Sequence, residues 1–181
     1  MAGLPFPLYP LQVLWINLVT DGPPALALSV EPPEEAVMRR PPRRRDEPLL
    51  TAGHARQVVG LGLLMGVTTL ALGAYFLARG HPGWQTVVFT ALAVAQFFNV
   101  YAVRTSKPLW RPGSRNPSLG AAVTVGALLL AAVIYVPGLR PYFQTYPLGV
   151  VDVAACLVPG LVAAAVVDVT ELRGRRRSAE A

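Results

Sequence analysis

Three oxygen-bearing side chains stand close together in an apolar stretch near the start of the chain. In residues 14–30, LWINLVTDGPPALALSV, they are Asn17, Thr20 and Asp21. An acidic residue at the centre of a membrane span costs roughly 2.5 to 3.5 kcal/mol, and such residues usually face a bundle interior or a water-filled path. Amide, hydroxyl and carboxylate oxygens suit Ca²⁺, Mg²⁺, Mn²⁺, Na⁺ or K⁺ rather than copper or zinc. We therefore predict that these residues are cation ligands.

The spacing of these residues and the helix breakers behind them support this prediction. Asn17 and Asp21 are four positions apart and Thr20 is three from Asn17, so on an α-helix their oxygens should fall close to one face. The Gly-Pro-Pro at 22–24 should interrupt the helix just after them. Unwound backbone at membrane depth is tolerated where it lines a cavity and offers carbonyls to an ion. For Asp21 alone, a structural carboxylate bonded to another helix is the alternative.

A second pair of polar residues lies in a later apolar stretch. Gln96 and Asn99 are three positions apart in TALAVAQFFNVYAVR, so they share one side of a helix. They either supply amide oxygens to the same ion or bond across helices, and the residues alone leave both readings open. Because Ca²⁺ takes about 6 to 8 oxygens, the chain is expected to hold part of a site.

The elements that must position these residues are membrane helices. The chain has 181 residues, of which 53% are hydrophobic and 14% charged, whereas a soluble domain carries about a quarter charged residues. Since a span needs about 20 apolar residues and must be helical, we predict an all-α bundle of five transmembrane helices. The expected spans are 8–30, 58–77, 86–103, 119–136 and 149–167. In the second, Gly62 and Gly66 form a small-residue face for helix packing.

The basic residues predict the orientation of the chain. A net charge of +6 could point to nucleic acid, but these residues lie between apolar runs, so we expect no nucleic-acid partner. Arg79 and Arg140 stand alone in their segments, while the other 14 of 16 follow the first span, follow the third, or occupy the tail. The positive-inside rule then places the N-terminus outside and the C-terminus in the cytosol. The plasma membrane is the expected location.

Other residues are expected to have no special role. Asp152 and Asp168 lie near the two ends of the last span, and His54 and His81 stand alone in loops without forming a ligand pair. We find no phosphate-binding glycine loop, nucleophilic triad or Cys and His metal cluster in the sequence.

The stretch LQVLWINLVTDGPPALALSVEPPEEAVMRRPPRRRDEPLL, residues 11–50, strongly resembles the sixth transmembrane helix and following cytosolic loop of P-type cation-transporting ATPases. It is most similar to the calcium pumps and their bacterial relatives, which carry Asn-Leu-Val-Thr-Asp-Gly on that helix and Pro-Pro, Arg-Pro-Pro-Arg and Glu-Pro-Leu in that loop. The remaining spans resemble helices seven to ten in number, orientation and loop length. The resemblance implies one C-terminal transmembrane domain over 1–177, followed by a short tail end at 178–181.

The resemblance also assigns roles to single residues. Asn17 and Asp21 match the family's ion ligands, and Thr20 matches a residue of the second ion site in two-site calcium pumps. Gln96 falls where those pumps have a glutamate, which favours one cation per cycle. Glu34 and Glu35 occupy the region where the family has acidic residues thought to couple the membrane to the catalytic domains.

The resemblance implies partners as well. The family's phosphorylated Asp-Lys-Thr-Gly motif, its nucleotide and actuator domains and its first five helices are not found in this sequence. We expect that the chain alone does not hydrolyse ATP, and that ATP and Mg²⁺ act through a missing catalytic part, with the lipid bilayer as the other partner. The alternatives are a non-catalytic membrane scaffold or regulator and a nonfunctional remnant.

Overall fold

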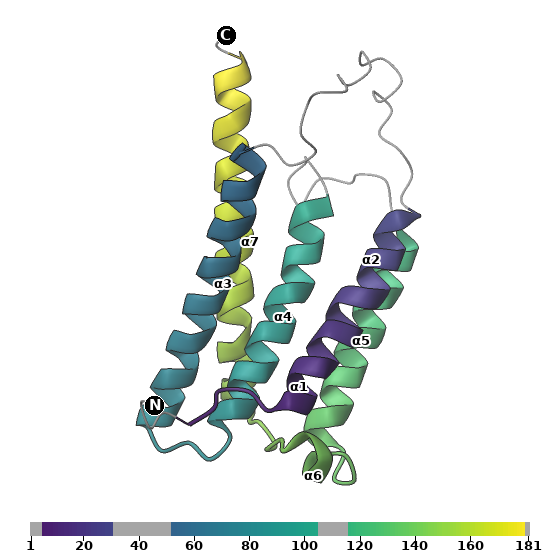
Figure 1. The fold of residues 1–181 in the computed structure, drawn as a ribbon, viewed down its shortest axis with the longest axis vertical. Coiled ribbons are helices and arrows are strands. Elements are labelled where there is room, and N and C mark those ends of the chain that lie inside the picture. The colour runs from purple at the N-terminus through teal and green to yellow at the C-terminus, as the bar shows by residue number, and fades with distance from the viewer. Residues whose placement is uncertain (1–4, 31–51, 105–115, 180–181) are drawn as a thin grey trace.

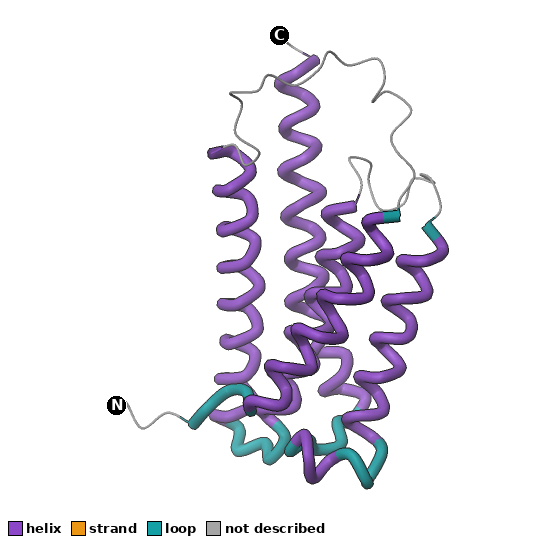
Figure 2. Tube along the Cα trace, turned by 45° about the vertical axis from the view of Figure 1, so that its right-hand side comes forward, coloured by secondary structure: helices purple, strands orange, loops and turns teal. Residues whose placement is uncertain are grey.

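The computed structural model describes residues 5–30, 52–104 and 116–179, and every regular element within these ranges is a helix. Figure 2 shows that helix accounts for most of the described chain, with the loops gathered at one end. Glu34, Glu35 and most of the loop arginines lie outside the described residues, as do the side chains of His54 and Asp168. The predicted all-α fold is confirmed.

The first predicted span is not one uniform helix. It consists of α1 (Pro10–Trp15), a π-helical segment η1 (Ile16–Asp21) and α2 (Gly22–Ser29), which follow one another without a gap. The remaining elements are α3 (Ala52–Ala78), α4 (Trp84–Arg104), α5 (Pro117–Tyr135), the short α6 (Arg140–Phe143) and α7 (Val150–Ala179). Figure 1 shows the long helices side by side, with α6 lying at one end of the bundle.

Three helical segments in the described chain are long and apolar enough to cross a membrane: Ala55–Ala78, Pro117–Tyr135 and Val150–Val167. They coincide with the predicted spans 58–77, 119–136 and 149–167. The expected span 86–103 forms one helix within α4, while the expected span 8–30 is divided by η1. For these two segments, membrane crossing stays a prediction.

Helix α4 occupies the centre of the bundle. It packs against α3, α5, α7 and η1, and Val87, Phe89, Ala91 and Ala93 are wholly buried. Because lipid tails are as apolar as these side chains, contact between membrane helices depends on close van der Waals packing, which small residues permit. The Phe89 ring meets the Trp15 ring edge-on, with 5.2 Å between centroids. Helix α4 therefore supports the segment that carries Asn17, Thr20 and Asp21.

Glycines on α5 and α7, rather than the predicted pair on α3, allow the closest packing. A Cβ atom built on Gly62 or Gly66 meets no atom within 4 Å, so this face has no partner within the described chain and its role in helix packing stays a prediction. At Gly126 a Cβ atom would lie 2.8 Å from Cζ of Phe97, and at Gly160 it would lie 2.6 Å from Cδ2 of Phe98. Two phenylalanines of α4 fill these positions, which is why glycine is needed opposite them.

The ends of the helices alternate between the two ends of the bundle. The turn between α3 and α4, the helix α6 and the start of α7 lie at one end, near residue 5 (Figure 1). The end of α2, the start of α3 and the end of α4 lie at the other. This is the alternation that the predicted orientation requires, and Arg79 and Arg140 belong to the first end.

Candidate cation site

The backbone forms a helical turn wider than that of an α-helix at the predicted ligands themselves. Residues Ile16–Asp21 form the π-helical turn, and α2 begins directly after it with Pro23 and Pro24 in its first turn. A proline has no N–H group, so the carbonyls about one turn before it lose their usual donors. The irregular backbone predicted for 22–24 therefore lies upstream of the prolines. Wide turns of this kind are frequent at functional sites.

Thr20 does not share the face of the other two residues. Asn17 and Asp21 are exposed, whereas Thr20 has 0% of its surface exposed. On a helix with more residues per turn, three positions along the chain fall farther short of a full turn than on an α-helix, so Thr20 and Asn17 point in more divergent directions. The expectation that all three oxygens fall on one face is therefore wrong for Thr20.

The structure nevertheless joins Thr20 to Asp21. The Thr20 hydroxyl donates to the Ile16 carbonyl at 2.7 Å, and its Oγ1 also lies 3.3 Å from Oδ1 of Asp21. Because the hydroxyl has one proton and an ionised carboxylate only accepts, Thr20 donates to the Ile16 carbonyl, to Asp21, or to both through a shared proton. Thr20 is therefore placed to orient the Asp21 carboxylate or to offer an oxygen of its own.

The apolar side of η1 faces this chain's own bundle. Trp15, Ile16 and Val19 are buried. A Cβ atom on Gly126 would lie 3.7 Å from Cγ1 of Val19, which places η1 close to α5. The exposed side, with Asn17 and Asp21, consequently points away from the core of the chain.

Two buried amide side chains anchor the ends of this broken helix. Gln12, with 0% exposure, donates from Nε2 to the Phe143 carbonyl at 3.0 Å and accepts from the Tyr9 amide at 3.1 Å. At the other end, Asn116 donates from Nδ2 to the Ala27 carbonyl at 2.8 Å. Sequence reasoning missed both residues, although the Asn-Pro at the start of α5 is a helix-capping signal.

Gln96 and Asn99 lie half-buried on α4. Oδ1 of Asn99 is buried and has no hydrogen-bond partner among the described residues, and a buried acceptor left unpaired costs about 1 to 3 kcal/mol. In the same part of the chain, no hydrogen bond joins either amide to Asn17 or Asp21. The structure therefore leaves their role as ligands a prediction.

Metal sites built from several acidic, histidine or cysteine residues do not occur in the described ranges. No three such side chains are grouped so that they would hold a metal ion there.

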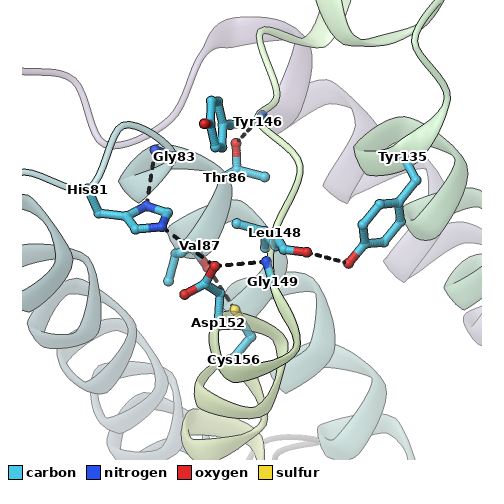
Figure 3. A network of polar contacts seen from close by, with 10 residues as sticks. All are labelled: His81, Gly83, Thr86, Val87, Tyr135, Tyr146, Leu148, Gly149, Asp152 and Cys156. Atoms are coloured by element: carbon cyan, nitrogen blue, oxygen red, sulfur yellow. Dashed lines mark hydrogen bonds and ion pairs between the residues drawn. The ribbon is translucent and has the colours of Figure 1, made fainter.

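At the end of the bundle where α1 begins, the structure joins His81 to Asp152. Nε2 of His81 lies 3.5 Å from Oδ2 of Asp152, and the same Oδ2 accepts from the Gly149 amide at 2.8 Å (Figure 3). The Gly83 amide donates to Nδ1 of His81 at 3.1 Å. The expectation that His81 stands alone is wrong, because the fold brings the α3–α4 turn onto the first turn of α7.

The hydrogen bonds define the protonation of this imidazole. Since Nδ1 of His81 accepts from Gly83, its proton is on Nε2, which faces the Asp152 carboxylate. Figure 3 shows Thr86 nearby, whose hydroxyl accepts from the Tyr146 amide at 2.9 Å. These contacts tie together the α3–α4 turn, the start of α4 and the segment that leads into α7.

Comparison with known proteins identifies the family. Residues 5–173 match the family described as cation transporting ATPase, C-terminus. The calcium-transporting ATPase of Bacillus subtilis (strain 168) is 39% identical over 152 residues, which cover 80% of this chain and 17% of that protein. Calcium-transporting ATPase 1 of Yarrowia lipolytica (strain CLIB 122 / E 150) is 34% identical over 166 residues, covering 87% of this chain and 18% of that protein.

A mammalian relative gives the same result. Calcium-transporting ATPase type 2C member 2 of Mus musculus is 33% identical over 157 residues, which cover 84% of this chain and 17% of that protein. The chain thus matches less than a fifth of the length of these three relatives. By the match over most of its length, the chain belongs to the cation-transporting ATPases and corresponds to their C-terminal membrane domain.

Proposed function

We propose that this domain supplies part of an intramembrane cation site to a P-type cation-transporting ATPase, with Asn17 and Asp21 as its principal ligands. One observation carries the proposal: both side chains are exposed on a widened turn of an apolar segment whose other side is buried in the bundle. Their exposed side is free to face the remaining helices of a pump.

The transported cation is proposed to be Ca²⁺. The similar proteins from Bacillus subtilis, Yarrowia lipolytica and mouse are all named calcium-transporting ATPases. Asp21 is the single carboxylate in residues 5–30 and supplies the charge, while Asn17 adds a neutral oxygen. Because Ca²⁺ binds about 6 to 8 oxygens, most of the shell must come from elsewhere in the pump.

Thr20, Gln96 and Asn99 complete this chain's contribution. Thr20 is buried beside Asp21 and holds Oδ1 of the carboxylate. The unpaired Oδ1 of Asn99 is an oxygen that gains a partner when it binds a cation. Since Gln96 is neutral, this set carries one negative charge, which favours one cation per cycle.

The energy for transport is proposed to come from ATP and Mg²⁺ bound to the catalytic part of the pump. That part and the first five helices are the proposed protein partners, within the lipid bilayer of the plasma membrane. Figure 1 shows the two termini at opposite ends of the bundle, and the distribution of Lys and Arg supports an N-terminus outside and a C-terminus in the cytosol.

The proposal is tested in a chimera in which this chain replaces the matching region of the Bacillus subtilis relative. Ca²⁺-stimulated ATP hydrolysis is measured in membrane vesicles. Asp21→Asn removes the charge at nearly constant size and should abolish Ca²⁺ stimulation. The matched control Asp152→Asn removes the same charge from α7, outside η1, and should retain it.

The possible outcomes separate the candidate functions. A shift of stimulation to Mn²⁺, Mg²⁺, Na⁺ or K⁺ would change the cargo but keep the site. Stimulation that is unchanged in Asp21→Asn would remove the transport role and leave a non-catalytic scaffold as the better account.

A further inference from the structure

A cavity of about 360 Å³ opens between α3 and α7. Arg56, Gln57 and Gly60 line it from α3, and Val166 lines it from α7. In the sequence, Arg56 is the last charged residue before the apolar stretch 58–78, and Asp168 is the first charged residue after the apolar stretch 153–167. The cavity therefore lies at the border of the apolar layer, where lipid headgroups begin, and it is separate from the candidate cation site on η1.

The cavity lies where α3 and α7 separate from each other. We call this region the fork, and Arg56, Gln57, Gly60, Leu61 and Val166 line it. Deeper in the bundle, the buried side chains of Met65 on α3 and Ala163 on α7 belong to one apolar cluster, with Leu61 packed against it. Toward the cavity, a Cβ atom on Gly60 would meet no atom within 4 Å. The two helices thus pack against each other at Met65 and Ala163, and they leave the space beside Gly60 unfilled.

The two parts of the fork differ in chemistry. Its upper part has the guanidinium of Arg56, which is exposed and for which no carboxylate partner is recorded among the described residues. Gln57 adds an amide beside it. Its lower part has apolar walls, including Leu61 and Val166. A guanidinium binds phosphate through paired, charge-assisted hydrogen bonds.

We propose that this fork binds an anionic phospholipid from the adjoining leaflet, with its phosphate on Arg56 and Gln57 and an acyl chain along Leu61 and Val166. Basic pockets between membrane helices at the headgroup level have the charge that anionic lipids require. The volume fits part of a lipid, since small-molecule pockets span about 300 to 1,000 Å³. A soluble anion would leave the apolar walls uncovered, so the lipid matches both parts of the fork.

The proposal is tested by native mass spectrometry of the full 181-residue chain in detergent, titrated with dioleoyl phosphatidylglycerol or dioleoyl phosphatidylcholine. The wild type should retain phosphatidylglycerol at lower concentration. Arg56→Gln should weaken its binding by roughly tenfold, as expected for the loss of one charge-assisted contact, and should leave phosphatidylcholine unchanged. Arg56→Lys should keep part of the preference.

Two further variants keep the test decisive. Arg79→Gln removes the same charge at the opposite end, where Arg79 lies over the Tyr75 ring, and should not alter lipid binding. Gly60→Leu puts a side chain into the cavity at a position where an added Cβ atom meets no atom within 4 Å, and it should displace the lipid while the thermal unfolding temperature is maintained.

Several results would overturn the proposal. They are equal retention of the two lipids by the wild type, a preference that survives Arg56→Gln, and full lipid binding by Gly60→Leu. Displacement of the lipid by millimolar inorganic phosphate would also contradict it, because the site would then recognise a free anion.

Discussion

Oγ1 of the buried Thr20 lies 3.3 Å from Oδ1 of the exposed Asp21. The contact joins the protein interior to the one carboxylate on the exposed side of η1. The contact holds Oδ1 of Asp21 near the wide turn. Oδ2 of the same carboxylate makes no hydrogen bond with Thr20. A ligand held in one orientation loses less conformational freedom when it binds an ion.

Thr20→Val tests this contact, because valine has a similar shape without the hydroxyl. We expect Ca²⁺ affinity in the chimeric pump to fall by roughly 10- to 100-fold, the range found when the partner of a metal ligand is removed. Thr20→Ser retains the hydroxyl and should lose little. Equal affinities for Thr20→Val and the wild type, measured from the Ca²⁺ dependence of ATP hydrolysis, would show that the hydroxyl is not needed.

Replacing both prolines that follow η1 should tighten the turn. The double variant Pro23→Ala and Pro24→Ala restores two N–H groups, which permits a regular α-helix through the segment. We expect weaker Ca²⁺ binding together with a higher thermal unfolding temperature. Pro117→Ala, also in the first turn of a helix, is the matched control and should leave binding unchanged. Wild-type Ca²⁺ affinity in the double variant would contradict a role for the wide turn.

Gly126→Ala should disturb the support of η1. The added Cβ atom would lie 2.8 Å from Cζ of Phe97, and overpacking of this kind costs about 1 to 3 kcal/mol. The unfolding temperature should fall, and Phe97→Leu should partly restore it. Gly62→Ala adds the same methyl group where no atom lies within 4 Å, so it should not destabilise. Equal unfolding temperatures for the two alanine variants would refute this packing.

The contact between His81 and Asp152 should contribute to stability without affecting transport. Asp152→Asn weakens the interaction with Nε2 of His81, and a double-mutant cycle with His81→Ala should give a coupling of about 0.2 to 1 kcal/mol, as for partly exposed pairs. Additive effects of the two variants on the free energy of unfolding would show that the pair is uncoupled.

The sequence predicts the long helices well, because their apolar length alone marks them. It also predicts a helix break near residue 22, since Gly-Pro-Pro is a local signal. It does not predict where that break lies, because the missing proline N–H groups act on carbonyls upstream, within η1. The burial of Thr20 follows from that wide turn and was consequently missed.

Contacts between distant residues are the other part that the sequence does not predict. His81 and Asp152 meet because α4 packs against α7, and no spacing along the chain indicates this pairing. The same holds for Gly126, which faces Phe97, while the regularly spaced Gly62 and Gly66 face open space. Small-residue spacing indicates where a close contact is permitted but not whether a partner helix is there.

Direct Ca²⁺ binding tests the central claim most closely. Equilibrium binding of radioactive Ca²⁺ to the purified chimeric pump, measured without ATP, should give one bound ion. Asp21→Asn should lower the affinity by roughly 100-fold or more, exceeding the 10- to 100-fold loss seen when only the partner of a ligand is removed. Asp152→Asn should bind normally. Unaltered Ca²⁺ binding by Asp21→Asn would contradict the assignment of η1 as a cation-binding segment.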